Sequence, residues 1–154
     1  KKDALPPALI RRAEAAGVRF LGMRTDMPAL YRLMDLFVLA SHREGFPRAA
    51  IEAAAMGCAL ILTDIRGCRE VVAHGSEGLL VPVRNPDALA EAIIRLVDDP
   101  TLRARFGAAA RRKALAEFDE ARVIARVLDT YRLVLNGIDG HHGTDGHRTA
   151  ALRS

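Results

Sequence analysis

Two acidic residues, Glu44 and Glu52, are the side chains whose type and spacing best suit ligand chemistry in this sequence. A carboxylate accepts hydrogen bonds from two hydroxyl groups at once, so it recognises a vicinal diol well. Glu44 lies in a loop after an apolar run, and Glu52 lies about one and a half turns inside the Ala-rich segment that follows. The two acids therefore flank the start of an expected helix.

The residues between the acids favour an anion site at that helix start. Pro47 near the first helical position loses no hydrogen bond, because the amide there would lack an intrahelical partner anyway. We expect the amides of Arg48, Ala49 and Ala50 to point out of the helix, where its dipole favours negative charge. Arg48 can add a charge-assisted bond, and Gly45 lets the backbone pass close to a ligand. With two flanking acids, this layout suits a nucleotide sugar, which has a diphosphate between two sugar rings.

The residues alone leave other interpretations open. Glu44 can be a solvated loop acid and Glu52 a helix-surface acid of an ordinary strand–loop–helix. A glycosidase pair of carboxylates is a third interpretation, disfavoured by the position of the acids beside a helix N-terminus. Neither G-x-G-x-x-G nor G-x-x-x-x-G-K-[ST] occurs, which argues against dehydrogenases and P-loop ATPases.

The elements that must position these residues alternate between strands and helices. The expected strands are apolar throughout, which is typical of an α/β, Rossmann-like parallel sheet with helices on both faces. In such sheets ligands bind beyond the carboxyl ends of the strands, where the loop with Glu44 lies. A doubly wound sheet usually has more than four strands, so we expect the fold to be truncated at its start. Expected helices span 5–16, 26–34 (capped by Asp26), 47–56, 67–73, 87–97, 101–116 (capped by Thr101) and 120–135, and expected strands span 18–21, 36–40, 59–62 and 78–81.

The length and composition indicate one domain, 1–135, followed by a Gly- and His-rich tail, 136–154, that we expect to be disordered. The net charge of +4 is carried almost wholly by Arg residues interspersed with acids. We interpret them as a solvated face and not as a nucleic-acid site, with contact to anionic lipid headgroups as the alternative. Cys58 and Cys68 lack metal-ligand spacing and fit buried thiols. No signal pattern or membrane-length apolar run is visible, so a cytoplasmic location is the default.

Glu44-Gly45-Phe46-Pro47 with a second acid at Glu52 resembles the Glu, seven residues, Glu signature of the retaining, two-Rossmann-domain (GT-B) glycosyltransferases of family 4 (glycosyl transferases group 1). Further segments follow the family's order over about residues 18–135. They are Val18–Gly22, Asp35–Leu39, Glu52–Gly57, Thr63-Asp64, Gly67–Val72 and Gly78–Pro82.

The resemblance implies a role for each matching position. Glu44 would be catalytic, contacting the donor sugar and stabilising an oxocarbenium-like transition state, and Glu52 would hold the ribose. Gly45 to Pro47 would give backbone contacts, and the segment from Gly22 to Arg24 would lie near the base. The full donor-binding set is Gly22, Met23, Arg24, Glu44, Gly45, Phe46, Pro47, Arg48, Ala49 and Glu52, with no metal ligand.

The resemblance also implies parts that this sequence lacks. The family's basic Arg/Lys pair and its acceptor-binding N-terminal domain would lie before Lys1, so we expect the chain to be inactive alone. The donor, such as a UDP- or GDP-sugar, would be a substrate, with no cofactor. The reaction would belong to bacterial polysaccharide or glycolipid synthesis, in the cytoplasm or at the inner face of the membrane. The alternative function is a non-catalytic nucleotide-sugar-binding module that needs a separate acceptor-domain partner.

Overall fold

The computed structural model describes residues 5–139 and has a parallel sheet enclosed by helices. Three strands form the sheet, in the order β1-β2-β3. The helices are α1 (Pro7–Ala15), α2 (Met27–Leu33), α3 (Arg48–Ala55), α4 (Arg66–Val71), α5 (Pro86–Asp98), α6 (Pro100–Glu117) and α7 (Glu120–Asp139), and the strands are β1 (Leu36–Leu39), β2 (Ala59–Thr63) and β3 (Gly78–Val81).

The central strand β2 is buried on both faces, which explains its unbroken apolar sequence. Leu60 and Leu62 point into one core, with α3, α4 and the C-terminal half of α6. Ala59 and Ile61 point into a second core, with α5, β3 and the N-terminal half of α6. Alternate side chains of a strand face opposite sides of the sheet, so one strand supplies both cores. The predicted α/β sheet with helices on both faces is confirmed.

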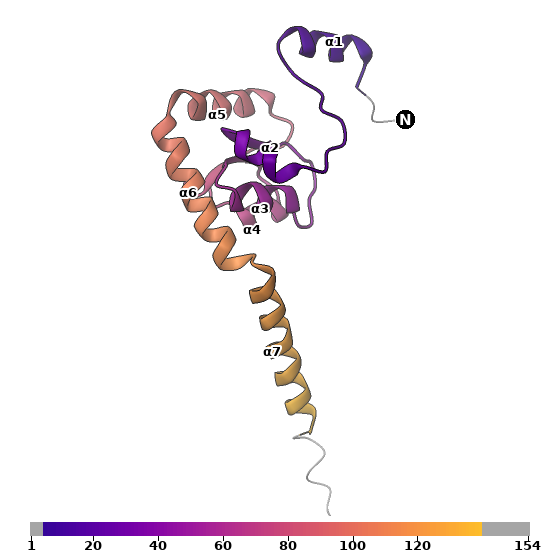
Figure 1. Ribbon diagram of the computed structural model, residues 1–154, viewed down its shortest axis with the longest axis vertical. Coiled ribbons are helices and arrows are strands. Elements are labelled where there is room, and N and C mark those ends of the chain that lie inside the picture. Colours follow the sequence, from indigo (N-terminus) through magenta and orange to yellow (C-terminus); the bar gives the residue numbers. More distant parts are fainter. Residues whose placement is uncertain (1–4, 140–154) are drawn as a thin grey trace, which may run out of the picture.

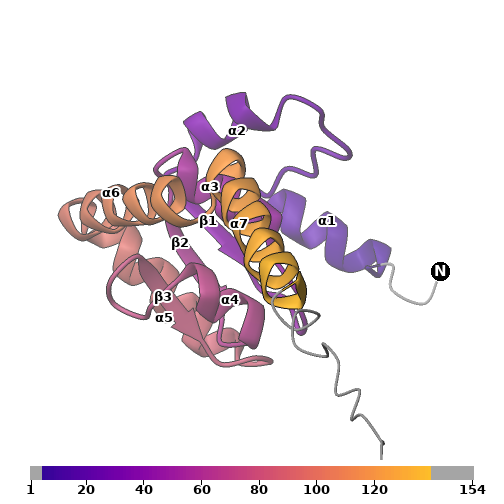
Figure 2. The ribbon, with the colours of Figure 1, turned by 90° about the horizontal axis from the view of Figure 1, so that it is seen from below.

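The helices differ in how closely they join this body. Figure 1 shows α5 and α3 on opposite sides of the sheet, while α1 is set apart and α7 extends away from it. Figure 2 looks nearly along α7 and shows α2 on the side of β1, with β3 at the other edge of the sheet. α1 has no buried residue. The packed body therefore comprises α2–α6 and the three strands.

The predicted strand at Val18–Leu21 is wrong. These residues are in no strand, and Val18, Phe20 and Leu21 are about half exposed. Strand geometry needs a neighbouring backbone that satisfies its N–H and C=O groups. Within the described residues β1 pairs only with β2, and no strand pairs with 18–21. An apolar run without a partner strand stays an extended, unpaired segment.

The other predicted elements occur within a few residues of their expected bounds, with differences at the caps. The α6 cap is Asp99, whose carboxylate accepts a 2.8 Å bond from the amide of Leu102, and not Thr101. Asp26 stands at the N-cap of α2, yet its carboxylate binds Arg24 instead of a helix amide. α7 continues past Leu135 to Asp139, and the rest of the expected tail, 140–154, lies outside the described residues.

None of the helices within residues 5–139 combines the length and the apolar content that crossing a membrane requires.

Candidate functional site

The loop that carries Glu44 is fixed at the carboxyl end of the sheet. The hydroxyl of Thr63, the last residue of β2, donates a 2.5 Å bond to the Ser41 carbonyl. The Ser41 hydroxyl in turn donates to Oε1 of Glu44 at 2.7 Å. Thr63 is 4% exposed, so this chain of hydrogen bonds starts in the core. The Glu44 carboxylate is therefore oriented by the sheet edge, as the parallel-sheet rule predicts for a ligand-binding loop.

Gly67, in the first turn of α4, lies directly against the backbone of this loop. A Cβ at Gly67 would stand 2.5 Å from the Glu44 carbonyl oxygen and 2.9 Å from that of Gly45. The next residue, Cys68, is buried, and burial followed by the nearby Glu44 charge raises the pKa of its thiol. The segment 67–70 thus supports the loop, with glycine required for the close approach.

The start of α3 differs from the expected row of three free amides. Pro47 (φ −78°, ψ 78°) forms an inverse γ-turn in which the Arg48 amide donates to the Phe46 carbonyl at 2.9 Å. The Ala50 amide donates to the Pro47 carbonyl at 3.0 Å. That part of the prediction is wrong, because the chain turns tightly enough to satisfy two of the amides itself. Of these three amides, only that of Ala49 has no acceptor among the described residues.

Glu52 is held by a residue that sequence analysis did not single out. The Tyr31 hydroxyl, on α2, donates a 3.0 Å bond to Oε2 of Glu52 on α3. Tyr31 is 3% exposed, whereas Glu52 is on the surface. No local pattern signals a contact between residues this far apart in the chain. The second acid is therefore positioned from the core, like the first.

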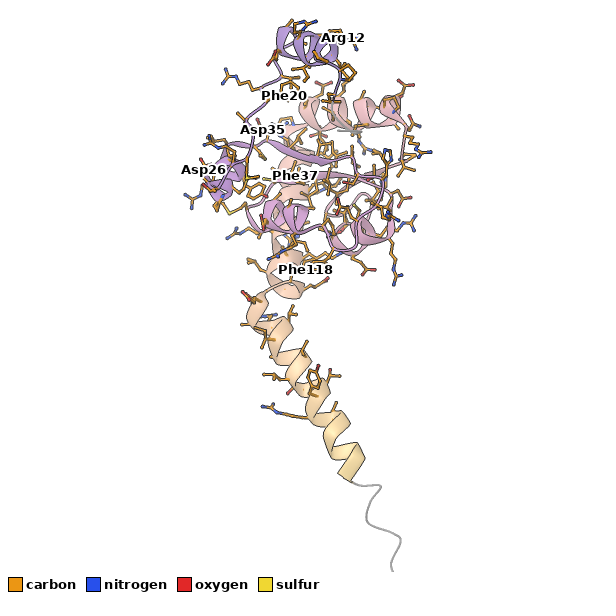
Figure 3. The ribbon with its side chains drawn as sticks, turned by 90° about the vertical axis from the view of Figure 1, so that its right-hand side faces the viewer. Arg12, Phe20, Asp26, Asp35, Phe37 and Phe118 are labelled. Carbon is orange, nitrogen blue, oxygen red and sulfur yellow. The ribbon has the colours of Figure 1, made fainter. Side chains whose placement is uncertain are left out.

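A groove of about 600 Å³ lies beside the start of α3 and brings three of the predicted donor residues together. One wall is an edge-to-face pair, Phe46 and Phe118, with ring centroids 5.8 Å apart. Figure 3 shows Phe118 at the base of the body, where α7 departs. The groove therefore combines apolar walls with charged groups. Its lining is Phe46, Arg48, Ile51, Glu52, Phe118, Glu120, Val123 and Ile124.

The predicted base-binding segment, Gly22 to Arg24, is exposed and makes local contacts. Met23 is 98% exposed. The Arg24 guanidinium donates two bonds, of 2.8 and 2.6 Å, to the Asp26 carboxylate, which lowers the pKa of Asp26. This segment leads directly into α2, whose Tyr31 reaches Glu52. Its role at the base stays a prediction.

The histidines and cysteines of residues 5–139 lie outside the groove. His42 is exposed and, together with Arg84, lines a separate cavity of about 210 Å³ at the sheet edge. Cys58 and Cys68 are buried free thiols, as predicted. Within residues 5–139 no three His, Cys, Asp or Glu side chains gather as metal ligands. The three histidines of the tail, His141, His142 and His147, lie outside the described residues.

The site thus presents two oriented carboxylates, one before the start of α3 and one within it, with one available helix amide and the exposed guanidinium of Arg48 between them in the sequence. Carboxylates accept hydrogen bonds from hydroxyls, and a helix N-terminus with an arginine attracts an anion. This arrangement can bind a ligand that carries hydroxyl groups at two ends and negative charge between them.

Solved structures of known proteins share this fold. HepE of Anabaena, in complex with UDP and glucose, is 28% identical with a TM-score of 0.75, over 81% of this chain and 35% of that one. The C-terminal domain of a glycosyl transferase group 1 family protein, LpcC of Francisella tularensis, is 27% identical with a TM-score of 0.64, over 73% of this chain and 62% of that one.

Curated proteins with known names are similar to this chain in sequence. The N,N'-diacetylbacillosaminyl-diphospho-undecaprenol alpha-1,3-N-acetylgalactosaminyltransferase of Campylobacter jejuni is 35% identical over 124 residues, which are 80% of this chain and 33% of that protein. The chain spans about a third of the length of the curated relatives it matches. The family model for glycosyl transferases group 1 matches residues 8–113. On its sequence and its fold, the chain belongs to the glycosyl transferases group 1 family.

Proposed function

We propose that this chain binds a nucleotide sugar between Glu44 and Glu52 and is the donor-binding part of a retaining glycosyltransferase. The observation that carries the proposal is the orientation of each acid by a hydroxyl from elsewhere in the body, Ser41 for Glu44 and Tyr31 for Glu52. Each carboxylate keeps one oxygen that accepts no hydrogen bond from the described residues. Those oxygens are acceptors for the hydroxyls of the donor sugar and of the ribose.

The diphosphate between the two rings would lie at the start of α3. The Ala49 amide would donate a hydrogen bond to the diphosphate, and the positive end of the helix dipole would stabilise its charge. Arg48 would add a charge-assisted hydrogen bond. These groups act on the charge that develops on the leaving diphosphate as the glycosidic bond breaks. The complex of HepE with UDP and glucose supports a nucleoside diphosphate as the ligand class.

Glu44 would act at the sugar end. Family resemblance assigns it to the donor hydroxyls and to an oxocarbenium-like transition state, in which a nearby carboxylate stabilises positive charge. Its fixed carboxylate supports that role, because a group that is already oriented needs no reorganisation during the reaction. The name of the Campylobacter relative supports lipid-linked saccharide assembly as the setting. The location we propose is the cytoplasm or the inner face of the membrane.

Calorimetric titration of the folded chain with UDP and with GDP tests the binding claim. We expect one of them to bind, with equal affinity in the presence of EDTA because no metal is part of the proposal. Glu52→Gln should weaken binding about 10-fold or more, since a hydrogen bond to a charged group is lost. Glu91→Gln, the same change at an exposed acid of α5 outside the groove, is the matched control and should leave affinity unchanged. A folded sample that binds neither nucleotide would overturn the proposal.

Catalysis needs a second experiment, with a full-length enzyme that contains this sequence. Glu44→Ala should lower turnover far more than it lowers stability, because Glu44 belongs to neither core cluster. Loss of stability with intact turnover would make Glu44 structural. A full-length protein that binds donor and never transfers sugar would instead support the alternative function, a non-catalytic binding module.

A further inference from the structure

Tyr31 is the most completely fixed polar side chain that touches the proposed site. Its ring lies in the core beneath α3, with the Phe37 ring packed edge-on at 6.0 Å. Its backbone carbonyl accepts a 3.3 Å bond from the Cys58 thiol. Ring and backbone are both constrained, so the hydroxyl has one position, and it is used to donate to Glu52.

Glu52 lacks such constraints of its own. It lies on the exposed surface of α3 and lines the groove with Phe46 and Arg48. A free glutamate loses side-chain entropy when it is ordered, and a ligand that binds it must offset this cost. The Tyr31 hydroxyl selects one orientation of the carboxylate before any ligand arrives. Only one of the carboxylate's lone-pair positions is used for this bond, so the group can still accept from a diol.

The tyrosine stays a donor under all ordinary conditions. Burial, and then the hydrogen bond to the Glu52 carboxylate, raise the pKa of Tyr31 from 10.0 to about 12. Its hydroxyl is therefore protonated throughout the neutral range.

We propose that Tyr31 is a positioning residue, whose buried hydroxyl presets the Glu52 carboxylate for the ribose diol of the nucleotide. The proposal rests on the proposed function, because it needs Glu52 to be a ribose ligand. It adds a residue from α2 that makes no contact with the ligand itself and acts only through the acid.

A matched pair of ligands and a matched pair of variants test this role. The ligands are UDP and 2′-deoxy-UDP, or GDP and 2′-deoxy-GDP if the chain prefers guanine. The variants are Tyr31→Phe, which removes the hydroxyl and keeps the ring, and Phe37→Leu, which disturbs the ring contact and keeps the hydroxyl. Calorimetry gives the affinity of each variant for both ligands, and the melting temperature shows how far each is destabilised.

We expect the wild type to bind the ribonucleotide more tightly than the deoxyribonucleotide. Tyr31→Phe should lower ribonucleotide affinity about 5-fold to 10-fold, the effect of one hydrogen bond, and lower deoxyribonucleotide affinity less, because that ligand keeps only the 3′-hydroxyl. Phe37→Leu should lower the melting temperature and keep the ratio of the two affinities. A Glu52→Gln background should remove most of the Tyr31→Phe effect, since the hydroxyl acts through that carboxylate.

Three results would overturn the inference, and they are distinguishable. If Tyr31→Phe lowers both affinities equally, or neither, the hydroxyl is purely structural. If the wild type binds both ligands equally, the 2′-hydroxyl is not recognised, so Glu52 does not bind the ribose diol, and diphosphate binding stands without it. If the folded wild type binds no nucleotide at all, the proposed function fails together with this inference.

Discussion

Two regions differ in what holds them: the corner from Glu44 to Glu52, and residues 18–24, of which Gly22 to Arg24 were predicted, like the corner, to contact the donor. The corner is supported from β2 by Thr63, from α4 by Gly67 and from α2 by Tyr31. The segment has exposed apolar side chains and a local ion pair, and no strand of the described residues pairs with it. Figure 3 shows Phe20 between α1 and the sheet.

The difference shows that two predicted parts of one binding site can depend on different kinds of contact for their position. The loop between β1 and α3 is fixed by contacts from neighbouring elements of the fold, namely β2, α4 and α2. An extended segment needs a second backbone along its whole length before its position is defined. The corner is therefore preorganised in this chain, and the three predictions below test whether the contrast with 18–24 is real.

The largest effect is expected at the glycine that supports the corner. Gly67→Ala puts a Cβ against the backbone carbonyls of Glu44 and Gly45, which cannot move aside as a flexible side chain can. We expect a loss of about 1–3 kcal/mol in the free energy of unfolding, measured by urea denaturation. Gly45→Ala is the matched control, because no atom lies within 4 Å of its added Cβ. Equal unfolding free energies for the two variants would contradict the close packing of α4 on the loop.

A smaller effect is expected from the ionisation of Tyr31 at alkaline pH. Its folded pKa of about 12 exceeds its ordinary value of 10.0, so its contribution to stability is complete below pH 10 and is lost as the pH rises to about 12. Relative to Tyr31→Phe, the wild type should lose about 1 kcal/mol of unfolding free energy between pH 10 and 11. Parallel stability curves for the two proteins up to pH 11 would show that Tyr31 is not held in its neutral form.

The smallest effect is expected in the unpaired segment. Phe20→Ser should change the free energy of unfolding by no more than about 0.5 kcal/mol, because Phe20 is 49% exposed and belongs to neither core. Phe37→Ser, at a partly buried ring packed on the core, is the matched comparison and should be clearly destabilising. A Phe20→Ser variant that unfolds as easily as Phe37→Ser would remove the contrast between the two regions.

The sequence predicted the elements whose patterns are local and failed where a distant partner decides. The apolar runs at β2 and β3 were recognised because burial leaves a continuous signal, and β1 carries a similar run although its residues are only partly buried or exposed. The run 18–21 has a similar composition, but composition does not reveal whether a neighbouring strand is present to pair with it. The caps at Asp26 and Thr101 were misjudged because several residues near each helix start can accept or divert the same hydrogen bond.

The candidate site was predicted in part, for the same reason. Glu44 and Glu52 could be named from residue type and spacing, and both are oriented by hydrogen bonds that the spacing cannot encode. Tyr31 lies 21 positions from Glu52, and Gly67 meets Glu44 only after β2 returns the chain to the sheet edge. The tight turn at Pro47 engages the amides of Arg48 and Ala50, which depends on backbone angles and not on residue type.

Amide chemical shifts recorded by NMR during a titration of the chain with UDP, and separately with GDP, test the central claim most directly. With the nucleotide that binds, we predict the largest change at the Ala49 amide, which has no acceptor among the described residues, with further changes at Gly45 and Glu52. The segment 22–24 should shift less, because it is not fixed against the corner. No change in residues 44–52, or the largest changes around His42 and Arg84 at the separate cavity, would contradict the account.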